Sequence, residues 1–463
     1  MQIYNTMTRK KEELIPLVPG QISMYACGPT VYNYFHIGNA RPFIVFDTLR
    51  RYLEYRGYNV RFVQNFTDID DKMIRRANEE GTTVKELGER FIKEYYHDAD
   101  ALGVRRASVN PRATEHIGEI ISLVRTLIEK GHAYATPDGD VYFSVRSFDG
   151  YGKLSGQNID DLENGARVDP DEAKRDPLDF ALWKAEKPGE PSWDSPWGKG
   201  RPGWHIECSA MSMAILGETF DIHGGGQDLI FPHHENEIAQ SEAATGHPFA
   251  RYWMHNGYIN IDNQKMSKSL GNFFTVRDIA KEFDLEAVRM FMLGVQYRNP
   301  VNFSREMIQQ AQSVLERLRT AKERLAEAQI APSGTAEDAA FLEELQDIKT
   351  RFCEAMDDDL NTADAIGVLF DFARAANTFV TQPRGKAAIE AGRALFDELS
   401  GVLGILTQKK TEELPAEALA LLEERQAVRK AKNFARADEI RDALKEMGFT
   451  VEDTATGPKL KKL

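Results

Sequence analysis

The sequence has 463 residues, of which 42% are hydrophobic and 28% are charged, a composition typical of a globular protein. At roughly 150 residues per domain, this length predicts about three domains. The formal net charge of −14 argues against a protein that coats nucleic acid nonspecifically, because such binding needs clustered Lys and Arg.

Targeting and redox features predict a cytoplasmic protein. No run of about 18 apolar residues is present to span a membrane, and residues 1–5 lack the basic and then apolar pattern of a secretory signal. Three cysteines are too few for a disulfide framework in a chain of this length. We therefore expect reduced thiols and no membrane association, and no stable protein partner is evident from the sequence.

The amino-terminal region predicts half of a nucleotide-binding α/β unit. Residues 22–26 are apolar and β-like, and they end at Cys27-Gly28-Pro29, where glycine and proline stop a strand. A helix is expected just past His36, because apolar residues recur at helical spacing over residues 43–53. Residues 59–66 then predict a second strand. This βαβ outline places His36 at a helix amino terminus, where phosphates are favoured.

The next region predicts an insertion between two halves of that unit. Residues 112–130 predict a strongly amphipathic helix, which a stretch rich in Gly, Asp and Pro follows. The second half is expected to resume near Gly203, with a strand at 218–223, a helix from His233 and a strand near Tyr252.

The carboxy-terminal part is predominantly helical. Apolar residues recur at helical spacing from Arg305 to about Thr407. The first apolar stripe comprises Met307, Ala311, Val314, Leu315 and Leu318. A polar linker at 408–415 precedes a last small unit. From Arg425 to Leu463 there are ten Lys or Arg and six Asp or Glu, so this end is basic within an acidic chain.

Two short segments carry the strongest functional signal. His36-Ile37-Gly38-Asn39 lies near the start and Lys265-Met266-Ser267-Lys268-Ser269 lies far downstream, with Asp221-Ile222-His223-Gly224-Gly225-Gly226-Gln227-Asp228 between them. A histidine at a helix start is by itself most often a cap, and a Lys-rich segment is most often a solvated loop. Both segments in this order, with an intervening Phe-Pro-His-His-Glu-Asn-Glu run, do not arise easily by chance.

The combination resembles the paired nucleotide-binding signatures of the class I aminoacyl-tRNA synthetases, and the cysteine and histidine positions are similar to those of the cysteinyl-tRNA synthetases. The resemblance implies an α/β fold with a Rossmann-like parallel-sheet catalytic domain split by an insertion, followed by a helical bundle and a small carboxy-terminal anticodon-binding domain. The expected ranges are 1–115 and 203–264 for the catalytic halves, 116–202 for the connective insertion, 265–304 for the KMSKS loop and connecting segment, 305–407 for the bundle and 408–463 for the last domain.

The implied enzyme is a cysteine–tRNA ligase. It would use ATP with magnesium to convert L-cysteine to cysteinyl-adenylate and then transfer cysteine to tRNA(Cys). Such chemistry depends on positioning and charge stabilisation, so Lys265 and Lys268 would neutralise the phosphates while His36 and Asn39 donate hydrogen bonds. Many family members have a second His where Asn39 stands. The positions assigned to ATP are His36, Gly38, Asn39, Gly224, Gly225, Gly226, Lys265, Ser267 and Lys268.

The three glycines have two interpretations. They would let adenosine lie against bare backbone, or they form a tight turn.

A zinc site is the second implied feature. Cys27 and Cys208 are both expected at strand ends, and His233 and Glu237, four residues apart, would share one helical face. Two sulfurs, a nitrogen and an oxygen suit tetrahedral zinc, although from spacing alone His234 can replace His233. The resemblance selects Cys27, Cys208, His233 and Glu237 for one zinc ion per chain. Because a thiolate binds zinc better than a hydroxyl does, the metal would distinguish cysteine from serine.

The resemblance also assigns substrate pockets. The cysteine-binding positions are Thr67, Trp204, His205 and Asp228, with Asp228 facing the substrate ammonium and Trp204 closing over the side chain. The anticodon-binding positions are Arg429, Phe434, Asp438 and Asp453. Basic groups would contact phosphates and Phe434 would stack on a base; the alternative is a solvated helix with Phe434 buried.

Two other functions are weighed against the ligase. A cysteine:amino-sugar ligase makes the same adenylate but lacks an anticodon-binding end. A noncatalytic zinc-containing tRNA-binding protein would not need both Lys265 and Lys268. The family further suggests a monomer.

Overall fold

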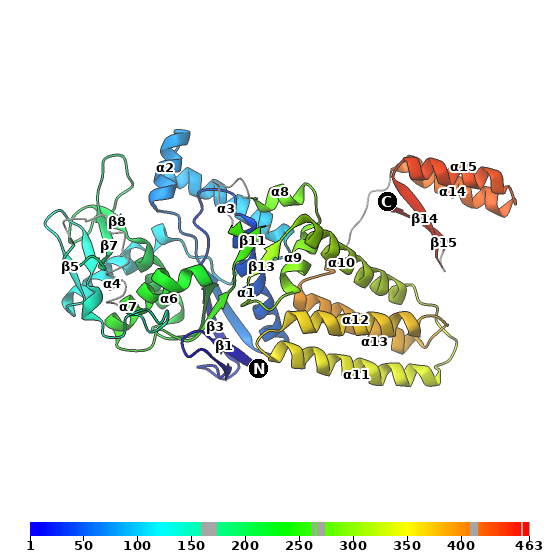
Figure 1. The fold of residues 1–463 in the computed structure, drawn as a ribbon, viewed down its shortest axis with the longest axis horizontal. Helices are drawn as coiled ribbons and strands as arrows, with labels where there is room; N and C mark the ends of the chain where they lie inside the picture. The colour runs from blue at the N-terminus through cyan, green and yellow to red at the C-terminus, as the bar shows by residue number, and fades with distance from the viewer. Residues whose placement is uncertain (159–173, 262–263, 266–273, 408–414, 455–456, 463) are drawn as a thin grey trace.

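The structure is a computed structural model, which describes residues 1–463 except 159–173, 262–263, 266–273, 408–414, 455–456 and 463. Its centre is a four-stranded parallel sheet in the order β10-β9-β3-β4 (Figure 1). The strands are β3 (Gln21–Ala26), β4 (Asn59–Gln64), β9 (Phe220–Gly226) and β10 (Ala250–Asn256). Each side of the insertion contributes two strands, so the predicted α/β class with a split parallel sheet is confirmed.

Helix α1 (Ile37–Tyr55) joins β3 to β4. Its predicted start is confirmed, since His36 is the N-cap and its Nδ1 accepts a hydrogen bond from the Asn39 amide at 3.3 Å. Its predicted apolar positions are all buried: Phe43, Phe46, Leu49 and Leu53. Strand β4 ends at Gln64, two residues before the predicted end, and is followed by α2 (Asp71–Glu80) and α3 (Val84–Ala101).

The insertion forms its own antiparallel sheet in the order β5-β6-β7-β8. Its elements are α4 (Ile117–Glu129), β5 (Ala133–Ala135), β6 (Val141–Phe143), β7 (Phe180–Ala185) and β8 (Gly200–Pro202). Helix α4 starts later than the predicted residue 112, because Arg112 is held extended by a backbone bridge to Phe66 and a 3₁₀ turn follows it. The buried face of α4 packs on α6 (Trp204–Leu216) and α7 (Glu235–Thr245), helices that follow the insertion.

Two helices, α6 (Trp204–Leu216) and α7 (Glu235–Thr245), flank β9. The expectation that Cys208 ends a strand is wrong, because it lies in α6. The α6 sequence contains no glycine or proline, and five of its 13 residues are Ala, Met or Leu, which favour helix. Helix α7 begins at Glu235 rather than at His233, which belongs to a preceding π-helical turn.

Strand β9 also differs from its predicted range. It begins at Phe220 rather than at residue 218 and continues past His223 through three glycines. Pairing with β10 extends it, since Gly224, Gly225 and Gly226 lie opposite residues 254–256. The strand predicted near Tyr252 is confirmed as β10.

A small sheet and a helical bundle follow. The connecting elements are β11 (Ile259–Ile261), β12 (Gln264–Lys265), α8 (Val276–Ala280), α9 (Leu285–Leu293) and β13 (Val301–Phe303). The bundle helices are α10 (Arg305–Ala326), α11 (Ala336–Asp357), α12 (Thr362–Phe379) and α13 (Lys386–Leu403). The α10 stripe is confirmed except at Met307, which is 41% exposed while Ile308 is buried.

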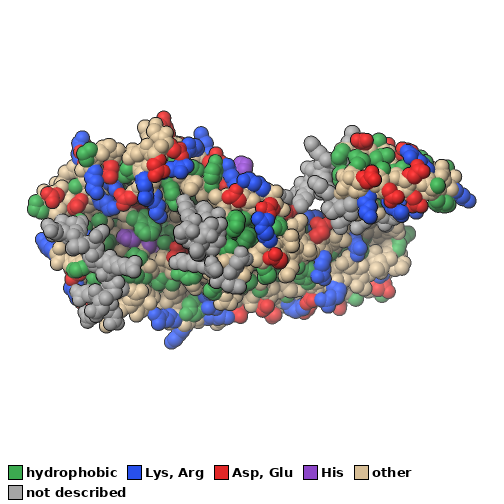
Figure 2. All heavy atoms as spheres, turned by 45° about the horizontal axis from the view of Figure 1, so that its top comes forward, with side chains coloured by type: hydrophobic (Ala, Val, Ile, Leu, Met, Phe, Trp, Pro, Cys, Tyr) green, Lys and Arg blue, Asp and Glu red, His purple; other side chains and the backbone are tan. Residues whose placement is uncertain are grey.

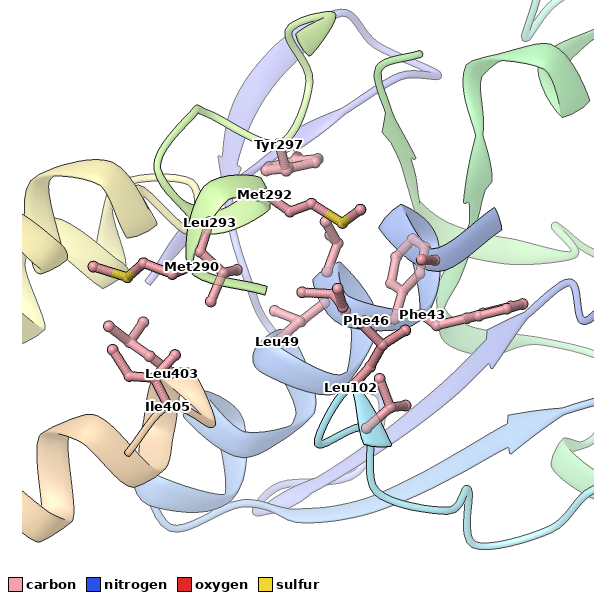
Figure 3. Packing of buried hydrophobic residues seen from close by; sticks show 14 of the residues in the cluster. Phe43, Phe46, Leu49, Leu102, Met290, Met292, Leu293, Tyr297, Leu403 and Ile405 are labelled. Carbon is pink, nitrogen blue, oxygen red and sulfur yellow. The ribbon is translucent and has the colours of Figure 1, made fainter. Parts of the chain in front are cut away.

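The largest apolar core joins the bundle to α1. Figure 3 shows Phe43, Phe46 and Leu49 of α1 near side chains of α9 and the end of α13. The buried guanidinium of Arg289 lies at the same junction, where it donates to Asp47 Oδ2 at 2.6 Å and to the Leu403 carbonyl at 2.8 Å. The helix with the first signature is therefore packed directly against the bundle.

The chain ends in a small separate unit. Its elements are α14 (Ala416–Lys430), α15 (Phe434–Glu446), β14 (Phe449–Thr454) and β15 (Gly457–Lys462). The unit has its own core of Ala418, Ile440, Leu444 and Phe449. At the other end, β1 (Gln2–Asn5) and β2 (Lys10–Glu13) form a hairpin. Among the described helices, none has the length and apolarity needed to cross a membrane.

Candidate metal and nucleotide site

Four side chains predicted as metal ligands lie together beyond the carboxyl end of β3. The ligand atoms of Cys27, Cys208, His233 and Glu237 all lie within 4.8 Å of one another, and we call them the four-ligand cluster. They come from the turn after β3, from α6, from the π-helical turn and from α7. Figure 2 shows histidine side chains, in purple, within a hollow on the left of the view.

The distances within the four-ligand cluster suit a shared ion. The Sγ atoms of Cys27 and Cys208 are 3.9 Å apart, and both thiols are free. Nε2 of His233 is 3.0 Å from Oε1 of Glu237, which is 3.5 Å from Sγ of Cys27. Two sulfurs, one imidazole nitrogen and one carboxylate oxygen are a donor set that zinc accepts, so the residues present fit that metal.

A second ligand set shares two of these residues. Cys27 and Glu237 also come together with His223 and His234. Sγ of Cys27 is 3.3 Å from Nε2 of His234, and Oε2 of Glu237 is 2.8 Å from Nε2 of His223. Sequence reasoning did not select His223, although it stands in the run before the three glycines.

The two ligand sets differ in the aromatic side chains that stack on their histidines. The His223 ring stacks on the buried Trp253 at 4.4 Å, whereas His233 stacks at 4.4 Å on Trp204, which is 44% exposed. The set with His233 and Cys208 therefore lies closer to the surface and supplies a second sulfur. The geometry favours His233 over the His234 alternative for a metal that meets a substrate.

Neighbouring side chains determine the charge states of the residues in the four-ligand cluster. Burial alone would raise the pKa of Glu237, but the imidazoles of His223 and His233 lower it to about 2. Burial opposes a charge on His233, yet Glu237 and Cys208 raise its pKa to about 10. A hydrogen bond from Cys27 lowers the pKa of Cys208 to about 6, against the effect of burial. The cluster thus offers a carboxylate and a thiolate, which a divalent cation requires.

Three of the predicted cysteine-binding residues surround this cluster. Nδ1 of His205 is 2.9 Å from Nδ1 of His233, and Trp204 covers the same ring. The amide of Thr67 donates to the Pro29 carbonyl at 3.2 Å, which places Thr67 beside the turn that holds Cys27. Asp228 lies in a short 3₁₀ turn after β9 and is half-buried.

Backbone contacts bring the first signature close to the segment that follows the second. The Ile37 amide donates to the Phe274 carbonyl at 3.1 Å, and the Val276 amide donates to the Phe35 carbonyl at 3.2 Å. Lys265 lies in β12, opposite Asn260 of β11. Ser267 and Lys268 lie outside the described residues. The first signature therefore lies beside the described residues that follow the second signature.

Close packing leaves little room for a side chain at the three glycines after His223. A Cβ at Gly224 would lie 2.3 Å from the Phe46 ring, one at Gly225 would lie 2.8 Å from the His234 ring, and one at Gly226 would lie 2.3 Å from the Asp228 carboxylate. All three lie in β9, so the tight-turn interpretation is wrong. The absence of side chains at these glycines lets Phe46, His234 and Asp228 lie directly against the backbone of β9.

The predicted anticodon residues lie in the carboxy-terminal unit. Phe434 begins α15 and is 61% exposed, so the alternative in which it is buried is wrong. Arg429 lies in the last turn of α14, and Asp438 pairs with Arg441 at 3.3 Å. Asp453 lies in β14.

Three family models match the chain in the order of its units. Residues 13–313 match the catalytic domain of class I (C) tRNA synthetases. Residues 351–407 match the DALR domain, and residues 411–457 match the cysteinyl-tRNA ligase anticodon binding domain.

Solved structures of low sequence identity share the fold. A Mycobacterium tuberculosis methionyl-tRNA synthetase in complex with methionyl-adenylate is 16% identical with a TM-score of 0.58, over 83% of this chain and 89% of that one. A putative arginyl-tRNA synthetase from Campylobacter jejuni is 12% identical with a TM-score of 0.58, over 84% and 94%. The Thermus thermophilus arginyl-tRNA synthetase is 13% identical with a TM-score of 0.56, over 86% and 84%.

Proposed function

This chain belongs to the class I tRNA synthetases of the cysteinyl type, and on that premise we propose that its four-ligand cluster holds one zinc ion that selects L-cysteine. The enzyme is a cysteine–tRNA ligase, which activates its amino acid with ATP and transfers it to tRNA. The observation that carries the zinc proposal is the convergence of two thiols, an imidazole and a carboxylate beneath a half-exposed tryptophan.

Zinc would supply a soft Lewis acid that binds a thiolate far better than a hydroxyl. The chain's own residues prepare that contact. Glu237 and Cys208 bring negative charge, and His205 orients the His233 ring through its Nδ1 contact. Trp204, stacked on His233, would cover the substrate side chain and exclude water. Thr67 and Asp228 complete the proposed pocket, with Asp228 facing the ammonium group.

ATP, with magnesium, is proposed to bind across the two signatures. His36 caps α1, so phosphate groups at this terminus would meet the positive end of the helix. Gly38 and Asn39 lie in the first turn, and Gly224 to Gly226 would contact adenosine. Lys265, Ser267 and Lys268 would neutralise pyrophosphate as it leaves.

The carboxy-terminal unit is proposed to read tRNA(Cys). The match of residues 411–457 and the exposure of Phe434 support contacts by Arg429, Phe434, Asp438 and Asp453. The same match speaks against an amino-sugar ligase, which lacks this end, and against a noncatalytic protein, which needs no catalytic domain. A cytoplasmic monomer and the six residue ranges predicted from the sequence remain parts of the proposal.

The deciding experiment is aminoacylation of tRNA by the full chain with each of the twenty amino acids, with metal analysis of the same preparation. We expect charging with cysteine, discrimination against serine by at least about 10⁴, and one zinc ion per chain. Active enzyme without zinc would remove the metal from the selection mechanism. Charging with a different amino acid would overturn the assignment of the substrate.

A further inference from the structure

One arginine of the helix that follows the first signature is buried without a paired charge. The side chain of Arg41 is 0% exposed and lies in α1, four residues after Ile37. Within the described residues, no carboxylate forms an ion pair with Arg41, and its Nε has no hydrogen-bond partner. Burial lowers the pKa of Arg41 to about 10, which leaves the guanidinium charged at neutral pH. Because a buried, unpaired charge is unfavourable for stability, we looked for a role in its contacts.

The guanidinium of Arg41 lies where two strands of the three-stranded sheet β12-β11-β13 begin, which we call the small sheet. Nη1 donates to the carbonyls of Gly257 and Tyr258 at 2.8 and 3.0 Å, directly before β11. Nη2 lies 3.5 Å from the carbonyl of Gln296, in the segment that leads to β13. Strand β12, which pairs with β11, ends at Lys265. Arg41 therefore joins the first signature helix to the sheet that carries the first lysine of the second signature.

The bundle holds the second of these segments, residues 296–299, from another side. The buried carboxylate of Asp359 accepts from Arg298 Nε at 2.7 Å and from the Tyr297 hydroxyl at 3.0 Å. Asp359 lies between α11 and α12 with a φ of 59°, a backbone conformation that Asp and Asn adopt more readily than most residues. A continuous series of contacts thus runs from the bundle through residues 296–299 to Arg41.

We propose that Arg41 is a positioning residue that fixes the small sheet, and with it Lys265, relative to the amino terminus of α1. This inference rests on the proposed function, because it takes ATP to bind across the two signatures. Both signatures must then hold one triphosphate at the same time, so a change of about 1 Å in their relative position would cost about 10²-fold in rate. The contacts of Arg41 lie at the small sheet rather than in the four-ligand cluster, so cysteine binding should not depend on Arg41.

The test is Arg41→Met in the full-length protein, which replaces the guanidinium with an apolar side chain. The fold should persist, because both carbonyls that Nη1 contacts have a second donor. The Gly257 carbonyl also accepts from Asn256 Nδ2 at 3.1 Å, and the Tyr258 carbonyl also accepts from the Val301 amide at 2.9 Å. The kcat for cysteine-dependent ATP–pyrophosphate exchange should fall about 10- to 100-fold. The KM for cysteine and the metal content should stay at wild-type values.

Arg41→Lys separates position from charge. Lysine keeps the positive charge but has a single ammonium group, which cannot contact both segments as the guanidinium does, so kcat should remain at least about tenfold below wild type. Arg289→Lys is the matched control, since Arg289 is also 0% exposed and also donates to backbone carbonyls, but it contacts α1 at Asp47, in the second half of the helix. It should lower stability in chemical denaturation and leave kcat near the wild-type value.

A second variant, Asp359→Asn, loosens residues 296–299 from the side of the bundle. It removes the charge that pairs with Arg298 and keeps a side chain that tolerates the positive φ. The kcat for exchange should fall about 3- to 10-fold, with an unchanged KM for cysteine. Because both changes act through the same segment, Arg41→Met/Asp359→Asn should be little slower than Arg41→Met alone.

Three results would overturn the proposal. Arg41→Met could keep the wild-type kcat, Arg41→Lys could match Arg289→Lys in kcat, or the effects of Arg41→Met and Asp359→Asn could multiply fully in the double variant. If Arg41→Met does not fold, Arg41→Lys and Asp359→Asn decide between the outcomes, and a wild-type kcat in both would overturn the proposal. Failure of the proposed function is a separate result, since the wild-type protein would then show no cysteine-dependent exchange.

Discussion

The four-ligand cluster and the carboxy-terminal unit are both binding regions, but they are built in opposite ways. The cluster draws its side chains from four elements, and its ligands Cys208, His233 and Glu237 are buried. The carboxy-terminal unit presents residues from one continuous stretch of sequence, and its aromatic residue, Phe434, is 61% exposed. The first depends on the whole catalytic fold, while the second depends on a local surface.

This difference determines how binding in each region should respond to the loss of one side chain. In a buried centre every donor has a partner, so loss of one leaves the others uncompensated and the whole centre fails. On an exposed surface each contact competes with water and salt, so losses are graded. The predictions below test whether the two regions behave in these two ways.

The largest effect is expected for Cys208→Ser. A hydroxyl is a poor zinc ligand, so metal content should fall from one ion per chain to nearly none, and cysteine-dependent pyrophosphate exchange should be lost with it. Metal analysis and exchange on the same preparation measure both. Cys353→Ser is the matched control, since Cys353 lies in α11 away from the cluster, and it should keep metal and activity. A Cys208→Ser protein that retains both would break the all-or-none expectation.

The next largest effect is expected for Lys268→Ala, which removes a charge from the second signature. The maximal rate of pyrophosphate exchange should fall by roughly 10²- to 10³-fold, the usual cost of one contact that stabilises transition-state charge, with little change in the KM for cysteine. Lys281→Ala, on the 74% exposed Lys281 after α8, serves as the control. Wild-type exchange rates in Lys268→Ala would exclude this role.

Local features of the fold could be predicted from the sequence. Helix α1 was predictable because its cap and its apolar spacing are contained in twenty consecutive residues. Features that depend on packing between different elements could not be predicted. The sequence identifies helix α10 but misplaces its apolar face at Met307, because the helices packed against α10 decide whether Met307 or Ile308 is buried.

The same distinction between local and long-range features applies to the candidate site. Cys27, Cys208, His233 and Glu237 were named through family resemblance, since nothing in their spacing required them to meet. His223 and His255 were missed. His255 Nε2, on β10, lies 2.8 Å from Nδ1 of His234, which belongs to the π-helical turn before α7, so the contact joins two separate elements. Buried polar contacts of this kind are fixed by topology, which local patterns do not encode.

A graded effect is expected when the carboxy-terminal unit is removed after Thr407. Its apolar core is separate from the main core, so pyrophosphate exchange should remain largely intact. Charging of tRNA should fall about 10- to 100-fold, mainly through a higher KM, as expected for the loss of several phosphate and stacking contacts. The full-length protein should also lose tRNA affinity as salt rises. Equal charging by the two proteins would show that this unit does not bind tRNA and would reopen the amino-sugar ligase alternative.

The smallest effect is expected at an exposed ion pair, which tests the graded behaviour in folding rather than in binding. Asp71, at the start of α2, is 2.9 Å from Lys184 Nζ and also contacts Arg201, both from the insertion sheet. Partial burial alone would raise the pKa of Asp71, but these two cations lower it to about 2. In the unfolded chain the pKa is about 3.9.

A depressed pKa contributes stability that is present above the unfolded value and is lost as pH falls through the folded value. Because the side chain of Asp71 is 65% exposed, Asp71→Asn should lower the free energy of unfolding at pH 7 by less than about 1 kcal/mol. The difference from wild type should shrink as pH falls from about 4 and should disappear below about pH 2, where the Asp71 carboxyl is protonated in the folded wild-type protein as well. Chemical denaturation at several pH values measures this difference, and Asp138→Asn, on an exposed carboxylate of the same insertion, should show almost none. A difference for Asp71→Asn that stayed constant down to pH 2 would show that the ion pair is not its cause.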